Sequence, residues 1–452
     1  MPLELTREYI DNLHELIEQY DEKSVSTLVE SLHAADIAEV FNVLSLEEAK
    51  FLYMLLDGEK RADVIIELEE DRRERFLKAL SGEEIARQFI EEMDSDDAAD
   101  VIGELSEEMQ EEVLQHIKDV EQAGDIVDLL SYDEETAGGL MAKELIKVEE
   151  KWDIPTCIRE MRKQAEDVDE VYFIYVVDDG GILKGTLSLK RLLLANRNAK
   201  VTSLYKSDII SVKTDTHRED IANIMRKYDL VALPVVDSIG RLLGRITIDD
   251  VVDVMQEEAE RDYQMASGIA EDVEPSDNVF LLSRARLPWL FIGLLGGILA
   301  ALVLGGYEED LRVYPEMAFF IPLIAAMGGN VGVQSSAIIV QGLASKSLIF
   351  ESTGRKLMKE LLVAIMNGLI LSAIALAYNL VQKESLALTL SVSSALFSVI
   401  IFASVFGTFI PLLLERLKID PALATGPFIT TMNDIVSLFI YLIIGRMLYG
   451  VI

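Results

Sequence analysis

Cysteine, histidine and proline are scarce in this chain of 452 residues, which contains one, four and ten of them respectively. Because Cys157 is alone, an intrachain disulfide is excluded. Cys157 and the histidines all precede the long apolar runs that begin at Leu287, so those runs lack the soft ligands of a transition-metal carrier. We also find no Walker A loop, no Gly-x-Ser-x-Gly motif and no His-Glu-x-x-His motif, and we therefore expect that the protein is not an enzyme.

Basic residues are outnumbered, with 41 Lys and Arg against 78 Asp and Glu and a formal net charge of -37. Nucleic-acid binding needs clustered Lys and Arg, so we expect no nucleic-acid partner. Most of the acidic excess lies before residue 280, where it suits divalent cations, although solubility alone would also explain it. The N-terminus has no basic stretch followed by an apolar one, so we expect no signal peptide and a cytosolic soluble part.

Residues 1–130 are predicted to form an all-α superhelix. Apolar residues recur there at three- and four-residue spacing, and Ser45-Leu-Glu-Glu is a typical helix start. The stretch from Asp36 to Ser45 resembles the stretch from Asp97 to Ser106, which indicates stacked helical hairpins.

Residues 131–200 and 201–260 are predicted to be two similar α+β blocks. Val176–Gly185 matches Val235–Gly244, and each reads as a strand, a glycine turn and a strand before a helix. The tandem repeat resembles a pair of CBS modules, named after cystathionine β-synthase, and this resemblance implies a ligand sensor. Thr247 and Asp250 form a Thr-x-x-Asp pattern that can bind a ribose, so ATP is a candidate ligand.

An acidic helix from Asp249 onward leads into a segment, residues 261–284, that we predict to be a connecting helix. Residues 285–452 then contain enough apolar sequence for five membrane spans of about 20 residues. Lys and Arg gather before the first span, between the second and third, and after the fourth, which places those ends in the cytosol. The predicted spans are 287–306, 315–341, 361–381, 386–414 and 425–449.

The second span contains polar residues at unusual positions. Asn330 and Gln334 are four residues apart and share a helix face. Gly328 and Gly329 precede them, and such a pair can break a helix and free its carbonyls for an ion path. The alternative is a closely packed helix interface in which the amides form hydrogen bonds between helices.

Asp434 is the only acid in the last apolar run, and a carboxylate at mid-bilayer costs about 3 kcal/mol by insertion scales. Thr430 shares its helix face, and Gly426 interrupts the helix start between two prolines. Mg²⁺ keeps several waters and usually binds through one or two carboxylates, so Asp434 with nearby amides and carbonyls fits a partly hydrated Mg²⁺. The alternative is a hydrogen-bonded structural acid, and Asp420 is either a helix cap or part of the cytosolic mouth.

Taken together, these segments resemble the MgtE family of Mg²⁺ channels over essentially the whole chain. The most specific matches are Pro322–Gln334, with its Gly-Gly-Asn-x-Gly-x-Gln pattern, and Asp420–Asp434. The resemblance implies a multi-domain membrane protein: an all-α superhelical N-terminal domain, an α+β CBS pair, a connecting helix and a five-helix transmembrane domain. It also implies a homodimer in membrane lipid, with a pore on the two-fold axis lined by the second and fifth spans. The implied pore residues are Gly328, Gly329, Asn330, Gln334, Gly426, Thr430 and Asp434, with Asp420 at the mouth. Met327 departs from the family pattern, in which a small polar residue is common.

Regulation is expected from the acidic half. At low Mg²⁺ the acidic faces of the helical and CBS domains repel each other, and bound Mg²⁺ screens that repulsion and favours the closed state. The acid groups and the resemblance together give the candidate regulatory ligands Asp94, Asp97, Asp100, Glu219, Asp229, Asp249, Asp250, Asp253, Glu258 and Asp262. His217 and Arg261 stand where the family has acids, which predicts fewer or displaced regulatory ions.

The leading hypothesis is therefore a Mg²⁺-selective, Mg²⁺-gated channel of the plasma or inner membrane that imports Mg²⁺. One alternative is a Na⁺- or H⁺-coupled divalent cation exchanger or exporter in which Asp434 is a shared site. Another is a membrane receptor whose CBS pair senses adenine nucleotide and whose spans serve only as an anchor.

Overall fold

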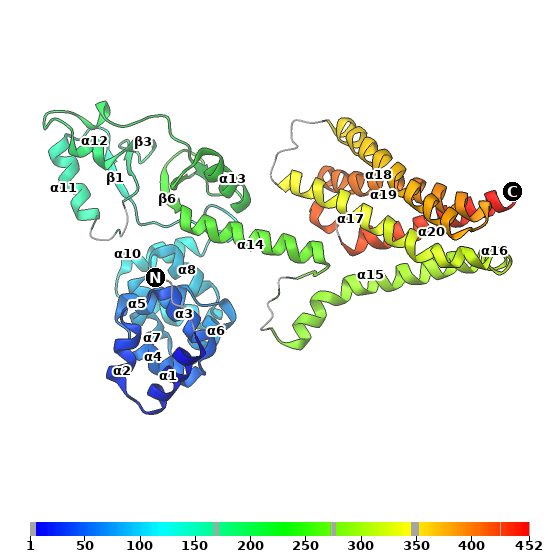
Figure 1. Cartoon of the computed structure of the whole chain (residues 1–452). Coiled ribbons are helices and arrows are strands. Elements are labelled where there is room, and N and C mark those ends of the chain that lie inside the picture. Colours follow the sequence, from blue (N-terminus) through cyan, green and yellow to red (C-terminus); the bar gives the residue numbers. More distant parts are fainter. Residues whose placement is uncertain are drawn as a thin grey trace. The chain divides into compact units, whose positions relative to one another are not determined.

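The structure is a computed structural model that describes residues 6–451 except 166–167, 169–170, 272, 274–276, 345–351 and 425. The polar break predicted between the second and third spans therefore lies partly outside the described residues. The chain divides into two compact units, an N-terminal unit of residues 1–256 and a C-terminal unit of residues 257–452 (Figure 1).

The N-terminal unit begins with short helices separated by tight turns. They are α1 (Arg7–Glu18), α2 (Glu22–Val29), α3 (Ala34–Val43), α4 (Leu46–Met54), α5 (Gly58–Ile66), α6 (Glu70–Leu77), α7 (Gly82–Gln88), the 3-10 helix η1 (Ile90–Glu92), α8 (Ser95–Gly103), α9 (Glu107–His116) and α10 (Val120–Leu129). The all-α prediction for this region is confirmed, and aromatic rings of Tyr53, Phe76 and Phe89 meet in its core.

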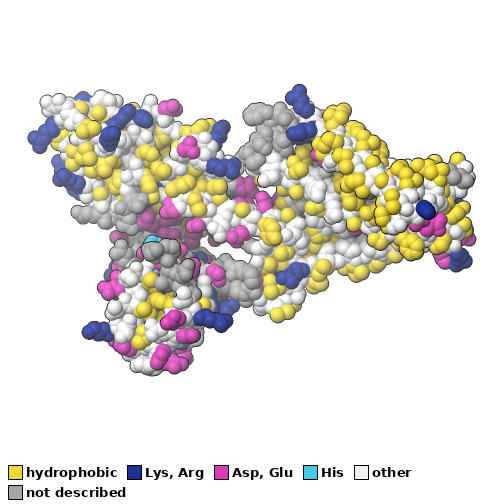
Figure 2. Space-filling model, viewed as in Figure 1, with side chains coloured by type: hydrophobic (Ala, Val, Ile, Leu, Met, Phe, Trp, Pro, Cys, Tyr) yellow, Lys and Arg dark blue, Asp and Glu magenta, His cyan; other side chains and the backbone are white. Residues whose placement is uncertain are grey.

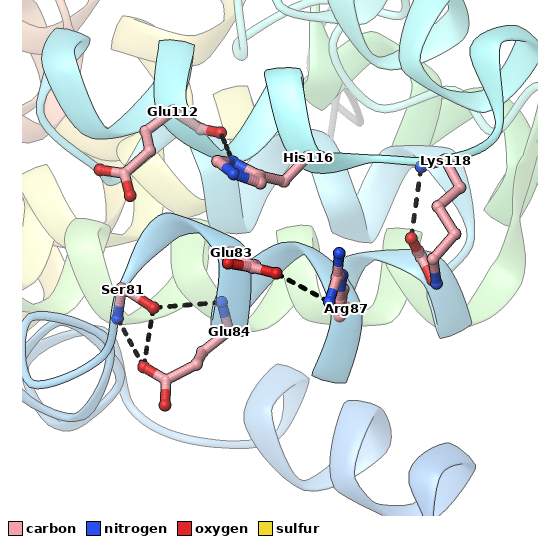
Figure 3. Close-up of polar contacts among 8 residues, drawn as sticks. Ser81, Glu83, Glu84, Arg87, Glu112, His116 and Lys118 are labelled. Atoms are coloured by element: carbon pink, nitrogen blue, oxygen red, sulfur yellow. Dashed lines mark hydrogen bonds and ion pairs between the residues drawn. The ribbon is translucent and has the colours of Figure 1, made fainter.

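Local side chains explain where these helices begin. Ser81 and Glu84 form a capping box at α7, in which Glu84 N donates to Ser81 Oγ at 3.4 Å and Ser81 N donates to Glu84 Oε2 at 2.9 Å (Figure 3). Ser45 and Glu48 repeat this arrangement at α4. Each box satisfies amide groups that the first turn of a helix leaves without partners. Within α7, an ion pair of 2.7 Å between Glu83 and Arg87 adds a contact between successive turns (Figure 3).

Two matching α/β blocks follow the helices. Each has a three-stranded sheet in which the first two strands are parallel and the last two antiparallel. The first block contains β1 (Ile146–Glu149), α11 (Ile154–Gln164), β2 (Ile174–Val177), β3 (Leu183–Leu187), α12 (Leu189–Leu193) and η2 (Val201–Ser203). The second contains β4 (Val212–Lys213), α13 (Arg218–Tyr228), β5 (Ala232–Val236), β6 (Leu242–Thr247) and the start of α14 (Ile248–Ser267). The internal repeat predicted from the sequence is confirmed.

Cys157 belongs to the core of the first block. It lies on α11 and is packed with Ile146, Ile174 and Leu187. Burial raises the pKa of its thiol to about 11. The only cysteine is therefore a buried, protonated core residue.

The predicted connecting segment is not one helix. α14 ends at Ser267, and Gly268 has a φ of 83°, which only glycine adopts easily. The next helix, α15 (Val279–Gly305), then begins. Residues 261–284 therefore contain the end of one helix and the start of another.

Within its described residues, the C-terminal unit contains five helices that are long and apolar enough to cross a membrane. They are α15, α17 (Ile321–Ala344, preceded by the 3-10 helix η3, Pro315–Phe320), α18 (Thr353–Gln382), α19 (Leu386–Leu417) and α20 (Pro427–Tyr449), and the short helices α16 (Glu308–Val313) and η4 (Pro421–Ala424) lie between them. α19 is central and packs against α17, α18 and α20. Hydrophobic side chains cover much of the visible surface of this unit, as expected for helices that contact lipid (Figure 2).

Candidate functional site

Three carboxylates converge at the start of α8. One oxygen from each of Asp94, Asp96 and Glu144 lies within 4.8 Å of the others, so the three can ligate one cation. Asp94 and Asp96 flank Ser95 at the helix start, and Glu144 comes from the segment before β1. The site therefore joins the helical region to the first CBS block.

Ser95 holds this group together. It is fully buried, and its N and Oγ donate to the two oxygens of Glu144 at 3.2 and 2.8 Å. The backbone N of Lys143 donates to Ser95 Oγ at 2.9 Å. These bonds fix Glu144 beside the acids of α8 despite the mutual repulsion of the carboxylates.

Two further acids surround the group, and we call the set of Asp94, Asp96, Asp97, Glu144 and Asp250 the acid cluster. Burial, followed by the charge of Asp97, raises the pKa of Asp96 well above its usual range. Burial and the charge of Asp250 raise the pKa of Asp97 to about 7. Each ionised carboxylate raises the free energy needed to ionise the next one, and a divalent cation would offset that increase.

Asp250 enters the cluster from the first turn of α14. Burial raises its pKa, and two hydrogen bonds from Thr247 oppose that shift, from Oγ1 at 2.7 Å and from N at 3.0 Å to Oδ2. Thr247 and Asp250, the predicted Thr-x-x-Asp pair, therefore lie at the start of α14, and the carboxylate of Asp250 faces the other acids of the cluster. Burial and the charge of Asp249 also raise the pKa of Asp253, one turn further along α14.

The other predicted regulatory acids lie outside the acid cluster. Asp100 lies on α8 one turn after Asp97, where burial of its carboxyl and the charge of Glu134 raise its pKa to about 7, and its own charge contributes to the raised pKa of Asp97. Asp229 ends α13 with a φ of 51°, and Glu219 lies in the first turn of that helix. Arg218 forms an ion pair with Glu135 at 2.8 Å, and His217 Nε2 lies 4.0 Å from the same carboxylate. Glu258 and Asp262 belong to the C-terminal unit, where Arg261 lies 3.8 Å from Glu258.

Two members of the cluster were missed by the sequence reasoning. Asp96 had a signal, because it lies in the run Asp94-Ser-Asp-Asp97, where a helix start brings alternate acids together. Glu144 had no such sequence signal, since it lies about fifty residues away and is held at α8 by hydrogen bonds from Ser95.

In the C-terminal unit, α17 and α20 pack through a contact that we call the glycine seam. Gly328 and Gly332 of α17 face Ser437 and Asn433 of α20 so closely that a Cβ would lie 2.1 Å from Ser437 Oγ and 1.8 Å from Asn433 Nδ2. α17 runs without a break through Gly328 and Gly329, so the predicted helix break is absent and the glycines permit close packing. Gly328 is buried in the seam.

Asp434 lies beside this seam. A Cβ on Gly329 would lie 3.1 Å from Asp434 Oδ1 and 3.2 Å from Thr430 Cγ2, so this glycine makes room for both side chains. Asp434 is half-buried, whereas the neighbouring Asn433 is fully buried on the seam side. Thr430 Oγ1 donates to the carbonyl of Gly426 at 3.0 Å, which steadies the first turn of α20.

Asn330 and Gln334 lie on a different face of α17. Both are exposed, as are Pro322 and Ala326 on the same face, and we call this surface the bare face of α17. Amide groups facing lipid are costly, so the bare face requires water or another protein surface.

Asp420 acts as a cap in this structure. It is exposed, and its Oδ1 accepts a hydrogen bond of 2.8 Å from Ala422 N at the start of η4. This bond supports the helix-cap interpretation of Asp420.

Substituting Gly332 with alanine is expected to destabilise the protein. The new Cβ would overlap the buried Asn433 side chain, and overpacking of this kind costs about 1–3 kcal/mol. The matched control is Gly297→Ala in α15, where nothing lies within 4 Å and alanine gains up to ~1 kcal/mol in helix propensity. Thermal unfolding of the full chain in detergent measures both, and equal unfolding temperatures for the two variants would contradict the close contact.

Sequence comparison adds three family matches. Residues 321–444 match the family described as divalent cation transporter (MgtE), residues 32–135 match the MgtE intracellular N domain, and residues 137–198 and 201–257 match the CBS domain. The magnesium transporter MgtE of Thermus thermophilus is 33% identical over 440 residues, covering 97% of this chain and 98% of that protein. The magnesium transporter MgtE of Enterococcus faecalis is 34% identical over 72% of each chain.

Solved structures resemble the N-terminal part. The cytosolic domain of the Mg²⁺ channel MgtE in complex with ATP is 33% identical, with a TM-score of 0.51 over 54% of this chain and 99% of that one. The soluble part of a magnesium transporter is 28% identical, with a TM-score of 0.50 over 56% of this chain and 98% of that one.

Proposed function

Because this chain belongs to the MgtE family of divalent cation transporters, we propose that it is a Mg²⁺-selective channel that imports Mg²⁺ and is closed by cytosolic Mg²⁺. The observation that carries the proposal is the placement of Asp434, half-buried beside Gly329 in a membrane helix whose neighbour presents two amides on a bare face. A lone carboxylate at this depth, with no room for a bulky neighbour, suits a small cation that keeps its waters.

The pore is proposed to form between two copies of the chain. A two-fold axis beside α17 and α20 would bring two Asp434 carboxylates to one hydrated Mg²⁺ and would cover both bare faces. Asn330, Gln334 and Thr430 would then contact the ion's water shell. In this arrangement Gly329 leaves space for the side chains of Asp434 and Thr430, and Gly328 allows α17 to pack closely against α20 in the glycine seam.

Closure is proposed to begin at the acid cluster. A Mg²⁺ ion held by Asp94, Asp96 and Glu144 would relieve the repulsion that Asp250 of α14 meets. At its other end, α14 contacts the start of α20: a Cβ on Gly426 would lie 2.3 Å from Ala266 O, and one on Gly268 would lie 2.5 Å from Pro427 Cγ. Ion binding in the cytosolic domains would therefore act on the start of α20, two turns before Asp434.

We propose the domain limits predicted from the sequence, residues 1–130, 131–200, 201–260, 261–284 and 285–452, with the end of α14 and the start of α15 in the connecting segment. We further propose that Thr247 and Asp250 contact a nucleotide, since a related cytosolic domain is known in complex with ATP. With His217 and Arg261 in place of acids, fewer regulatory ions are expected here than in relatives.

Flux into liposomes tests the function. Purified protein is reconstituted around a Mg²⁺-sensitive dye, and the expected result is Mg²⁺ entry without any Na⁺ or pH gradient, suppressed when Mg²⁺ is raised on the cytosolic side. Flux that disappears when the gradients are removed would support a coupled exchanger. Absence of flux combined with tight ATP binding would support a receptor.

A further inference from the structure

Glu360 is a carboxylate within a membrane helix that takes no part in the pore or the acid cluster. It lies on α18, and its Oε1 accepts hydrogen bonds from Ser335 Oγ of α17, at 2.7 Å, and from Ser404 Oγ of α19. The two hydroxyl oxygens are themselves 3.0 Å apart. One carboxylate oxygen thus joins three of the five membrane helices.

The hydrogen bonds between Glu360 and the two serines are largely shielded from solvent, and they depend on direction. Ser335 and Ser404 are both buried, with 4% and 2% of their surface exposed. Hydrogen bonds to a carboxylate are stronger than bonds between neutral groups, and the burial of both serines limits the access of water to them. Their geometry therefore constrains the direction in which Ser335 points.

Ser335 directly follows Gln334 on the same helix. Successive residues of an α-helix are rotated by a fixed angle, so the direction of Ser335 sets the direction of Gln334 and of Asn330 one turn earlier. Holding the hydroxyl in place holds the bare face in place.

The other contacts of α17 at this level are steric. At the glycine seam, Gly328 and Gly332 present backbone to α20, and Gly407 of α19 lies so close to Gly332 that a Cβ would be 2.4 Å from its carbonyl oxygen. The side chains of Ser437 and Asn433 fill the spaces that Gly328 and Gly332 leave, so the seam sets the distance between the helices, and the hydrogen bonds to Glu360 add a directional constraint.

We propose that Glu360 is a positioning residue, which fixes the rotation of α17 so that Asn330 and Gln334 face the permeating ion. The proposal rests on the proposed Mg²⁺ channel function. A serine that loses Glu360 can still donate to a carbonyl one turn back in its own helix, so removal of the carboxylate disturbs the pore more than the fold.

Flux and selectivity measurements on full-length protein in liposomes test this role. Glu360→Ala is expected to lower Mg²⁺ flux about tenfold and to lower the ratio of Mg²⁺ to Mn²⁺ flux, because loosely held polar groups discriminate poorly. Glu360→Gln keeps an acceptor oxygen at Oε1 and should restore both. Ser404→Ala should be intermediate, and the control Ser398→Ala on the same helix, whose hydroxyl donates to the Ser394 carbonyl at 2.9 Å, should match the unmodified protein.

Each outcome decides the question. A folded Glu360→Ala protein with normal flux and normal ion ratio would overturn the proposal. Loss of flux in Glu360→Gln as complete as in Glu360→Ala would also overturn it, since the charge itself would then matter. If Glu360→Ala fails to fold, the milder Ser335→Ala and Ser404→Ala variants carry the same comparison. Absence of Mg²⁺ flux in the unmodified protein would refute the channel function itself, whereas defects confined to these variants concern Glu360.

Discussion

Substitution of Asp434 by alanine is expected to abolish Mg²⁺ flux and to leave the protein folded. A carboxylate and a divalent cation about 4 Å apart attract each other by roughly 8 kcal/mol at an effective dielectric constant of about 20. Since ~1.4 kcal/mol changes an equilibrium tenfold, loss of even part of this attraction should lower flux by at least ~100-fold. Removing an acid from membrane depth should maintain or raise the unfolding temperature.

Two companion substitutions separate charge from shape at this position. Asp434→Asn keeps the size of the side chain but not its charge, so it should be as inactive as Asp434→Ala. The control Asp420→Asn changes an exposed cap at η4 by the same charge, and flux should fall only slightly. Liposome flux, gel filtration and thermal unfolding give the three readouts. Normal Mg²⁺ conductance in Asp434→Ala would remove this residue from the pore.

Closure by Mg²⁺ is expected to disappear in the double variant Asp94→Asn and Asp96→Asn. Both residues belong to the group of three whose carboxylate oxygens lie within 4.8 Å of one another. Flux through this variant should persist at a cytosolic Mg²⁺ concentration that closes the unmodified channel. A ligand at roughly 100 times its Kd stabilises a folded protein by about 2.7 kcal/mol, so the rise in unfolding temperature on adding Mg²⁺ should shrink as well.

Without Mg²⁺, the two substitutions are expected to have the opposite effect on stability, which provides a second test. Removing two crowded charges should make the variant more stable than the unmodified protein in a chelator. The control Asp11→Asn with Glu18→Gln removes the same charge from exposed positions on α1 and should leave closure intact. A variant that closes normally and keeps its full Mg²⁺-dependent stabilisation would refute a regulatory ion at Asp94 and Asp96.

Much of the architecture could be predicted because it depends on local signals. The helices Ile154–Gln164 and Arg218–Tyr228 follow from apolar periodicity, and the five membrane helices follow from long apolar runs between charged breaks. The connecting segment was the exception, since the left-handed conformation of Gly268 ends α14 within a sequence whose composition favours helix.

The candidate sites were less predictable because they depend on contacts between distant residues. The face shared by Thr430 and Asp434 follows from helical spacing. That Gly329 lies beside Asp434, and that Gly328 is buried against Ser437, depends on how α17 packs against α20. Ser95 holds Glu144 beside Asp94 and Asp96, and the packing of three helices brings Glu360 to Ser335.

The burial of Cys157 has a practical consequence for experiments. Its thiol lies in the first CBS core with a pKa raised to about 11, so it reacts slowly with thiol-specific reagents at neutral pH. A cysteine introduced at Asn330, Gln334 or another position on the bare face would be labelled selectively without mutation of the natural one. Because the natural cysteine reacts little, labelling reports on the introduced cysteine. Measured one position at a time, its accessibility to the reagent would show which surface of α17 contacts water and whether that surface changes with Mg²⁺.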